Sequence, residues 1–268
     1  MPIVLRVSFL FLILIMQINL YAKIKVDVLA DAGYEPYSFD KNGQPAGLYY
    51  EILKVIFAQM PEYEIIYHTM PWKRALNDLK INKAFAIYPP YYRPVERPWI
   101  QYSDKILDEH ISLFCRKDNK YAAKKKWPED FKDMIVAKNS GFIMGENFEK
   151  AVKSGLVKTD DGAQSTLQNL QKVKKNYADC YINDELSIKI AIFQNLVNED
   201  LGDNEKIIKV IDLVNEPAFL GYVNNKDFFP YKDKFITQFN KQLKKLKSSG
   251  ELEKIYNNFI KESLKKQN

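Results

Sequence analysis

The sequence predicts an α/β protein built from two units in succession. Strand-like and helix-like segments alternate from residue 23 to about residue 88, and a second alternating series begins near residue 134. A charged stretch, RKDNKYAAKKKWPED, separates the two series. Because such alternation is typical of a mainly parallel sheet covered by helices, each series indicates one α/β lobe.

The first series starts with the alternating run IKVDVLA and a loop rich in turn residues, DAGYEPYSFDKNGQPAG. Apolar residues at helical spacing then predict a helix over residues 48–57, followed by the strand YEIIYH, the helix PWKRALNDLK and the strand AFAIY. Pro71 suits the first turn of the second of these helices. Residues 89–108 hold four prolines and are expected to form a loop that ends at the strand ISLFC.

The second series reads as the strand MIVAK, the helix ENFEKAVKSG, the strand LVKT, the helix STLQNLQKVKK, the strand ADCYIND, the helix ELSIKIAIFQNL and the strand KIIKVID. The remaining tail predicts one strand, AFLGYV, and two helices with apolar stripes over residues 235–246 and 252–259. Gly250 stands between the helices, where a C′ residue is expected. This tail is too small to bury a core alone, so it must pack on an earlier lobe.

The first 22 residues have the pattern of a secretory signal peptide. Arg6 precedes an almost wholly apolar run over residues 7–16, and the small residue Ala22 stands where a signal peptidase would cut. The apolar core has about ten residues, fewer than the roughly 20 that a membrane-spanning helix needs. We therefore expect cleavage near Ala22 and a periplasmic protein that starts near Lys23, with an uncleaved membrane anchor as the alternative.

Composition excludes several other classes of protein. The formal charge of +6 comes from basic residues mixed with acidic ones along the chain, which does not favour nucleic-acid binding. His68 and His110 are the only histidines, and no His or Cys pair has metal-ligand spacing, so neither a metal nor a cofactor is expected. Cys115 and Cys180 either form one disulfide or remain two buried thiols.

Several segments, in this order and spacing, resemble the extracellular solute-binding proteins of the polar amino acid uptake type, family 3, which serve ABC transporters. They are GYEPYSF with GQPAGLYYEIL, then PVERPWIQYSDKI, VAKNSGFIMG, YADCYINDELS, FLGYVNNKD and FNKQLKKLKSSGELEKIYNNF. The resemblance covers nearly all of residues 23–260. It implies a two-lobed periplasmic-binding-protein fold of type II, in which two crossing strands join the lobes and the solute is held between them.

The resemblance also implies the division of the chain. Lobe 1 would comprise residues 23–117 and 218–268, and lobe 2 residues 118–217. The first crossing strand would follow residues 114–117, and the second would fall near residues 216–221. The helical tail would then pack on lobe 1.

Charged and turn residues of the implied site would bind the polar ends of an amino acid or a related carboxylate. Arg97, from the Glu-Arg motif, would grip a carboxylate through two parallel hydrogen bonds, with Arg74 as a weaker second anion contact. Asp184 would either bind an ammonium group or cap the helix that follows it. Gly141 and Phe142 form the turn whose backbone amides, near a helix start, would hold an anion, with simple packing as the alternative for Phe142.

Aromatic residues would supply the walls of this site. Tyr34 matches an aromatic residue that stacks over the ligand, and Trp72 either faces the same cleft or packs within lobe 1. The segment PPYYRP departs from the family, because Pro90 removes an amide donor and Tyr92 replaces a small hydroxyl residue. This segment either narrows the pocket or suits another solute, such as a dicarboxylate, an opine-like compound or a small peptide.

The resemblance therefore implies a monomeric binding protein, not an enzyme, that delivers a small solute to the membrane permease of an ABC transporter. Two alternatives share the fold. One is a periplasmic dehydratase that acts on a prephenate-like carboxylate and needs a general acid near the leaving hydroxyl. The other is a free-standing sensor that presents its ligand to a membrane receptor.

Overall fold

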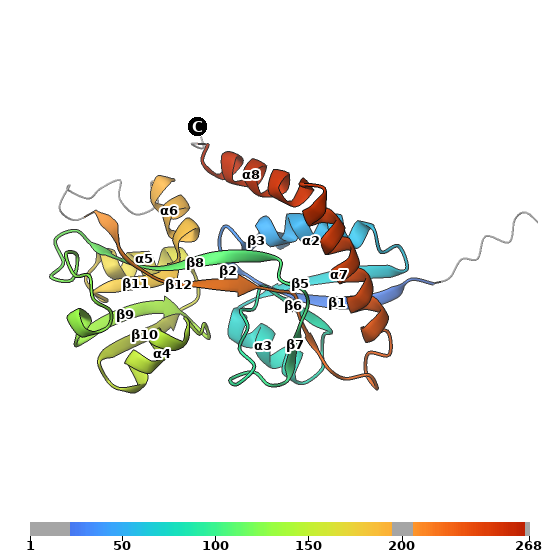
Figure 1. Ribbon diagram of the computed structural model, residues 1–268, viewed down its shortest axis with the longest axis horizontal. Coiled ribbons are helices and arrows are strands. Elements are labelled where there is room, and N and C mark those ends of the chain that lie inside the picture. Colours follow the sequence, from blue (N-terminus) through green and yellow to red (C-terminus); the bar gives the residue numbers. More distant parts are fainter. Residues whose placement is uncertain (1–21, 195–205, 266–268) are drawn as a thin grey trace, which may run out of the picture.

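A computed structural model describes residues 22–194 and 206–265, which form two α/β lobes side by side (Figure 1). The predicted signal peptide lies outside the described residues except for Ala22. Among the helices of these two ranges, none combines the length and the apolar character that crossing a membrane requires. The two successive series of the sequence therefore correspond to two lobes, as predicted.

Lobe 1 is built on a five-stranded sheet with the order β5-β1-β6-β13-β7. Its strands are β1 (Ile24–Asp31), β5 (Tyr63–Met70), β6 (Ala86–Tyr88), β7 (Ile100–Tyr102) and β13 (Gly221–Val223). β1 pairs in parallel with β5 and β6, whereas β13 is antiparallel to β6 and β7. The helix α2 (Leu48–Ala58) comes after β4, and α3 (Trp72–Lys80) comes after β5. Both helices were predicted from their apolar periodicity.

A small antiparallel sheet connects β1 to α2 and lies beside the other lobe. It contains β2 (Gly33–Tyr34), β3 (Ser38–Lys41) and β4 (Gln44–Ala46). Gly33 comes so close to lobe 2 that a Cβ atom there would lie 2.5 Å from the carbonyl oxygen of Gln164. A side chain at position 33 would therefore push the two lobes apart.

Lobe 2 contains a second five-stranded sheet, with the order β10-β9-β11-β8-β12. Its strands are β8 (Leu107–Arg116), β9 (Met134–Asn139), β10 (Val157–Ala163), β11 (Cys180–Asp184) and β12 (Ile207–Ala218). The helical segments of this lobe are η1 (Glu129–Phe131), α4 (Glu146–Lys153), α5 (Thr166–Lys174) and α6 (Glu185–Phe193). The alternation predicted for residues 134–193 is thus present in the described part of the lobe.

The two crossing strands, β8 and β12, run antiparallel along the lobes, with a register from Leu107↔Ala218 to Arg116↔Ile207 (Figure 1). The sequence-based boundary at residue 117 assigned the first of them to lobe 1. In the structure β8 pairs with β11 and β12 in the second sheet, so the change of sheet occurs before Leu107. An apolar strand fits either sheet, and long-range pairing decides between them. The prediction that AFLGYV forms one strand is wrong. β12 ends at Ala218 in the second sheet, and β13 begins at Gly221 in the first.

One disulfide resolves the alternatives left open for the two cysteines. Cys115 on β8 and Cys180 on β11 face each other across an antiparallel pair, and their Sγ atoms are bonded. The Cα atoms are 4.2 Å apart and both residues are fully buried. The bond therefore links the crossing strand β8 to its neighbour β11 inside the second sheet.

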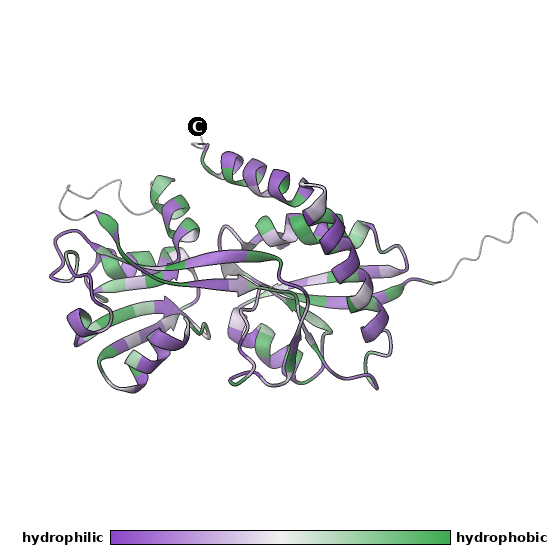
Figure 2. Cartoon of the chain, in the orientation of Figure 1, coloured by the Kyte–Doolittle hydropathy of each residue, from purple (hydrophilic) through white to green (hydrophobic). Residues whose placement is uncertain are grey.

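The tail forms α7 (Lys232–Ser248) and α8 (Glu251–Ser263), which meet at Gly250 in the left-handed conformation predicted for a C′ residue. Phe235, Phe239, Leu243 and Leu246 of the predicted stripe are all buried against lobe 1. The second stripe, on α8, is only half-buried. Hydrophilic residues cover most of both helices in Figure 2, and this agrees with packing along one face only.

Candidate functional site

A small cavity lies between the lobes, and most of the aromatic residues predicted for the site line it. About 20 Å³ inside it is open to the centre of a water molecule, which is room for about one water. The lining residues are Tyr34, Trp72, Pro89, Tyr91, Arg97, Phe142 and Ile143. The first five belong to lobe 1 and the last two to lobe 2. A solute larger than water therefore requires the lobes to separate before it can enter.

Arg97 is the one charged residue in this lining. Its side chain is 6% exposed, and burial lowers its pKa to about 10, so the guanidinium remains protonated at neutral pH. Nη2 donates a 2.9 Å hydrogen bond to the carbonyl oxygen of Gly141, and the guanidinium lies 5.7 Å from the ring centre of Trp72. No carboxylate in the described ranges forms an ion pair with it. This buried cation therefore has unused capacity to bind an anion.

The aromatic walls fit closely around Arg97. Phe142 of lobe 2 meets Tyr34 edge to face, with ring centres 5.2 Å apart, and meets Trp72 in the same way at 6.2 Å. Gly141 has φ +82°, and a Cβ atom there would lie 2.8 Å from the Lys73 side chain. Trp72 faces the cleft as well as packing in lobe 1, so its two alternatives are combined in one residue.

The turn at residues 141–142 presents carbonyl oxygens to cations, which differs from the predicted amide site. The Phe142 amide donates to the carbonyl oxygen of Asn139 within a turn. The Phe142 carbonyl oxygen accepts a 2.8 Å bond from Nζ of Lys138, whose pKa is lowered chiefly by burial. Moreover, α4 begins only at Glu146, so no helix start lies at the turn. Arg97 and Lys138 add positive charge beside this turn.

Gly141 contacts Arg97 without lining the cavity, and three other predicted residues, Arg74, Tyr92 and Asp184, lie outside it. Arg74 is 71% exposed on α3 and forms an ion pair with Asp78. It points away from the cavity because it follows Trp72 by two positions, and side chains two positions apart on a helix point to nearly opposite sides. Tyr92 is 52% exposed and packs against Tyr102 and Phe219. Asp184 caps α6, which is the second of its predicted alternatives.

The contacts of Asp184 use both carboxylate oxygens. One accepts the backbone amide of Ser187 at 3.0 Å and the other the amide of His110 at 2.9 Å, and the residue is 1% exposed. Burial raises its pKa. Both oxygens of Asp184 are therefore already occupied, and another residue is needed to bind an ammonium group in the cleft.

Asp31, which sequence reasoning missed, is a buried carboxylate at the carboxyl end of β1. Oδ1 accepts the amide of Gly33 at 2.9 Å, whereas Oδ2 is buried and has no donor among the described residues. Burial raises its pKa to about 7. Burial also raises the pKa of Tyr181 in lobe 2, with a smaller contribution from Asp31, which places this carboxylate within electrostatic range of the opposite lobe. Its position directly after a strand was the signal available in the sequence.

Lobe 2 contains a buried polar network at the ends of β9 and β11. The Tyr181 hydroxyl donates to Oδ1 of Asn139 at 2.8 Å and accepts from Nδ2 of Asn183 at 2.6 Å. The side-chain oxygens of Asn169 and Asn183 are buried without a donor in the described part of the chain. This network therefore has acceptors without donors, whereas Arg97 and Lys138 place cations beside the turn at residues 141–142.

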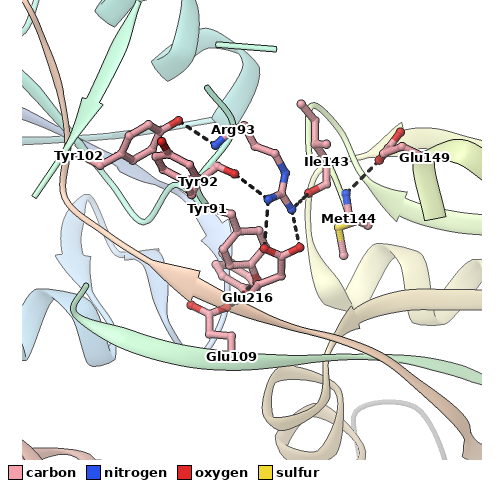
Figure 3. A network of polar contacts seen from close by, with 10 residues as sticks. Tyr91, Tyr92, Arg93, Tyr102, Glu109, Ile143, Met144, Glu149 and Glu216 are labelled. Atoms are coloured by element: carbon pink, nitrogen blue, oxygen red, sulfur yellow. Dashed lines mark hydrogen bonds and ion pairs between the residues drawn. The ribbon is translucent and has the colours of Figure 1, made fainter. Parts of the chain in front are cut away.

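Arg93 joins both lobes and one crossing strand (Figure 3). Its guanidinium forms a two-bond ion pair with Glu216 of β12, at 2.6 and 3.0 Å, and also donates to the carbonyl oxygens of Tyr92 and Ile143. Arg93 and Glu216 are 9% and 5% exposed. Since Ile143 belongs to lobe 2, the contact with its carbonyl oxygen helps to hold the lobes together.

Comparisons with known proteins agree with this architecture. A family model of bacterial extracellular solute-binding proteins, family 3, matches residues 26–262. A comparison with curated proteins finds no relative of this chain.

Several solved structures share the fold at low sequence identity. An amino acid ABC transporter substrate-binding protein of Streptococcus pneumoniae, bound to L-arginine, has a TM-score of 0.71 and 17% identity over 90% of this chain and 97% of that one. A histidine kinase sensor domain has a TM-score of 0.72 and 18% identity over 88% and 96%. An ancestral amino acid-binding protein, a precursor of cyclohexadienyl dehydratase, has 0.69 and 21% over 88% and 95%.

Proposed function

The chain belongs to the bacterial extracellular solute-binding proteins of family 3, and we propose that it captures a small zwitterionic solute, such as an amino acid, between its lobes. The solute's carboxylate would bind Arg97 and its cationic group would bind Asp31. The protein would then act as an exported monomer that presents the solute to the permease of an ABC transporter. The family supports binding, and the charged residues of the cleft support the class of solute.

The buried guanidinium of Arg97 is the observation that carries this proposal. A charge removed from water is costly unless it is paired, and within the described part of the chain Arg97 has one carbonyl oxygen and one aromatic ring as partners. A carboxylate between the lobes would accept two parallel bonds from its remaining N–H groups. The nearby Lys138 adds to the positive potential on the same side.

Asp31 supports a cationic group at the other end of the solute. A carboxylate oxygen buried without a donor is unfavourable, and either a proton or a bound cation relieves the cost. In lobe 2 the side-chain oxygens of Asn169 and Asn183 are also buried without donors among the described residues. An ammonium or guanidinium group would satisfy several of these acceptors at once.

Binding without turnover is favoured over the dehydratase alternative. Arg97 alone carries charge among the seven residues of the cavity lining, which holds no carboxyl or imidazole group, and the hydroxyls of its two tyrosines, Tyr34 and Tyr91, are bonded to Glu109. The dehydratase precursor among the structural neighbours is itself described as an amino acid-binding protein. Quantifying the solute before and after incubation with the protein tests this choice, because a binder returns it unchanged.

A thermal-shift screen of the mature protein tests the proposed function. The panel comprises the twenty L-amino acids, succinate and glutathione, each added singly. A compound present at a hundred times its Kd should raise the melting temperature by about 5 to 10 °C, because it stabilises only the folded protein. A positive response to an amino acid supports the proposal. Failure of every compound in the panel contradicts it.

The pH dependence of the protein's stability should reveal the raised pKa of Asp31. Its pKa is about 7 in the folded protein against 3.8 in the unfolded chain, so the folded state binds more protons between these values. Stability from this group is therefore present below pH 4 and is lost as the pH rises to 7. Asp31→Asn should melt higher than the wild type at pH 8 and equally at pH 4. Equal melting temperatures at both pH values would contradict this assignment.

A further inference from the structure

Glu109 holds three tyrosine side chains of lobe 1 from its position on the crossing strand β8. It is fully buried and accepts hydrogen bonds from the hydroxyl groups of Tyr34, Tyr49 and Tyr91, the last two at 2.5 and 2.6 Å. The Tyr34 and Tyr91 hydroxyls also lie 2.9 Å from each other. Burial raises the pKa of Glu109 to about 8, and this one carboxyl group gathers side chains from β2, from α2 and from the loop after β6.

Two of the three tyrosines line the cavity between the lobes, and one does not. Tyr34 and Tyr91 are part of the lining, together with Arg97, whereas Tyr49 is buried inside α2 and lobe 1. Because the hydroxyls of Tyr34 and Tyr91 bond to Glu109, their rings are fixed in orientation beside the cavity. The edge-to-face contact of Tyr34 with Phe142 depends on that orientation.

Glu109 connects these cavity walls to the crossing strands β8 and β12, which join the lobes. In the antiparallel register it lies opposite Glu216, the partner of Arg93. The Arg93 guanidinium lies 5.6 Å from the ring centre of Tyr91, and Figure 3 shows Tyr91 between the two glutamates. Any bending of the crossing strands therefore moves an anchor of the cavity walls.

We propose that Glu109 is a positioning residue for solute binding, which sets the aromatic walls of the cleft through Tyr34 and Tyr91 without touching the solute. This inference rests on the proposed function, because it assigns the cavity beside Arg97 to the solute. A buried acidic side chain held by three tyrosines is a costly way to gain stability alone, since an apolar side chain of similar volume often serves as well. Because Glu109 bonds to two residues of the cavity lining, Tyr34 and Tyr91, we infer that it serves solute binding.

Three matched variants test the inference: Tyr34→Phe, Tyr91→Phe and Tyr49→Phe. Each removes one hydroxyl donor from Glu109 and keeps the ring, so all three should fold and lose similar stability. The probe is an equimolar pool of the twenty L-amino acids with succinate and glutathione, titrated by calorimetry into each folded protein. Tyr34→Phe and Tyr91→Phe should weaken apparent affinity by about fivefold or more, the equivalent of one hydrogen bond, whereas Tyr49→Phe should stay within about twofold.

The outcomes separate this inference from the proposed function. If the wild type binds the pool and all three variants bind equally well, Glu109 has only a structural role and the inference is overturned. The same holds if Tyr49→Phe loses as much affinity as the other two. If the wild type does not bind the pool, the proposed function fails and the inference fails with it.

Discussion

Replacing Arg97 by alanine should abolish solute binding, with a loss of at least about a hundredfold in affinity. In the proposed complex the variant leaves the solute's carboxylate buried without its cation, and breaking a buried pair in this way costs about 3–5 kcal/mol. The fold should survive, because Arg97 forms no ion pair among the described residues and its removal leaves no carboxylate unpaired. Calorimetric titration with the strongest compound of the panel measures the loss.

Arg97→Lys is the matched control for this prediction. It keeps the positive charge but replaces the planar fork by a single ammonium group, so affinity should fall by an intermediate amount, about tenfold. The melting temperatures of both variants without solute should remain close to that of the wild type. Unchanged affinity in Arg97→Ala would remove Arg97 from the site.

Removal of the disulfide should have the largest effect on stability. The bond between Cys115 and Cys180 closes a loop of 65 residues. Loop closure of this length restricts the unfolded chain and stabilises the fold by about 4 kcal/mol. The double variant C115A/C180A should therefore melt about 8 to 16 °C lower than the wild type in differential scanning calorimetry.

Solute affinity separates this effect from an effect on the site. Neither cysteine lines the cavity, so the folded double variant should bind the solute as the wild type does. Reduction of the wild-type protein under mild denaturation should reproduce the loss of stability. A fall of less than about 2 °C in the variant would show that the loop-closure account is incorrect.

Much of the fold could be predicted because its signals are local. Apolar spacing identified the strands and helices of each lobe, and Gly250 marked the junction of α7 and α8. The assignment of β8 failed because its apolar residues satisfy either sheet. What decides is its long antiparallel pairing with β12 and its disulfide to β11, and both partners are distant in sequence.

The candidate site was predictable to a smaller extent. Tyr34, Trp72, Arg97 and Phe142 do line the interlobe cavity, at positions that the family resemblance indicated. Arg74 was misplaced because helix geometry turns it away from Trp72. The roles proposed for Asp31 and Glu109 could not be found from the sequence, because each depends on burial and on partners from distant segments. The ligand-binding role of the cavity residues remains a prediction.

A crystal structure of the protein grown with the strongest compound of the panel tests the central claim most directly. We expect electron density for the compound between the lobes. Its carboxylate should pair with both terminal nitrogens of Arg97, and the compound's cationic group should lie within hydrogen-bond distance of Asp31. Density for the compound outside the interlobe cleft, or a carboxylate bound there without Arg97, would contradict it.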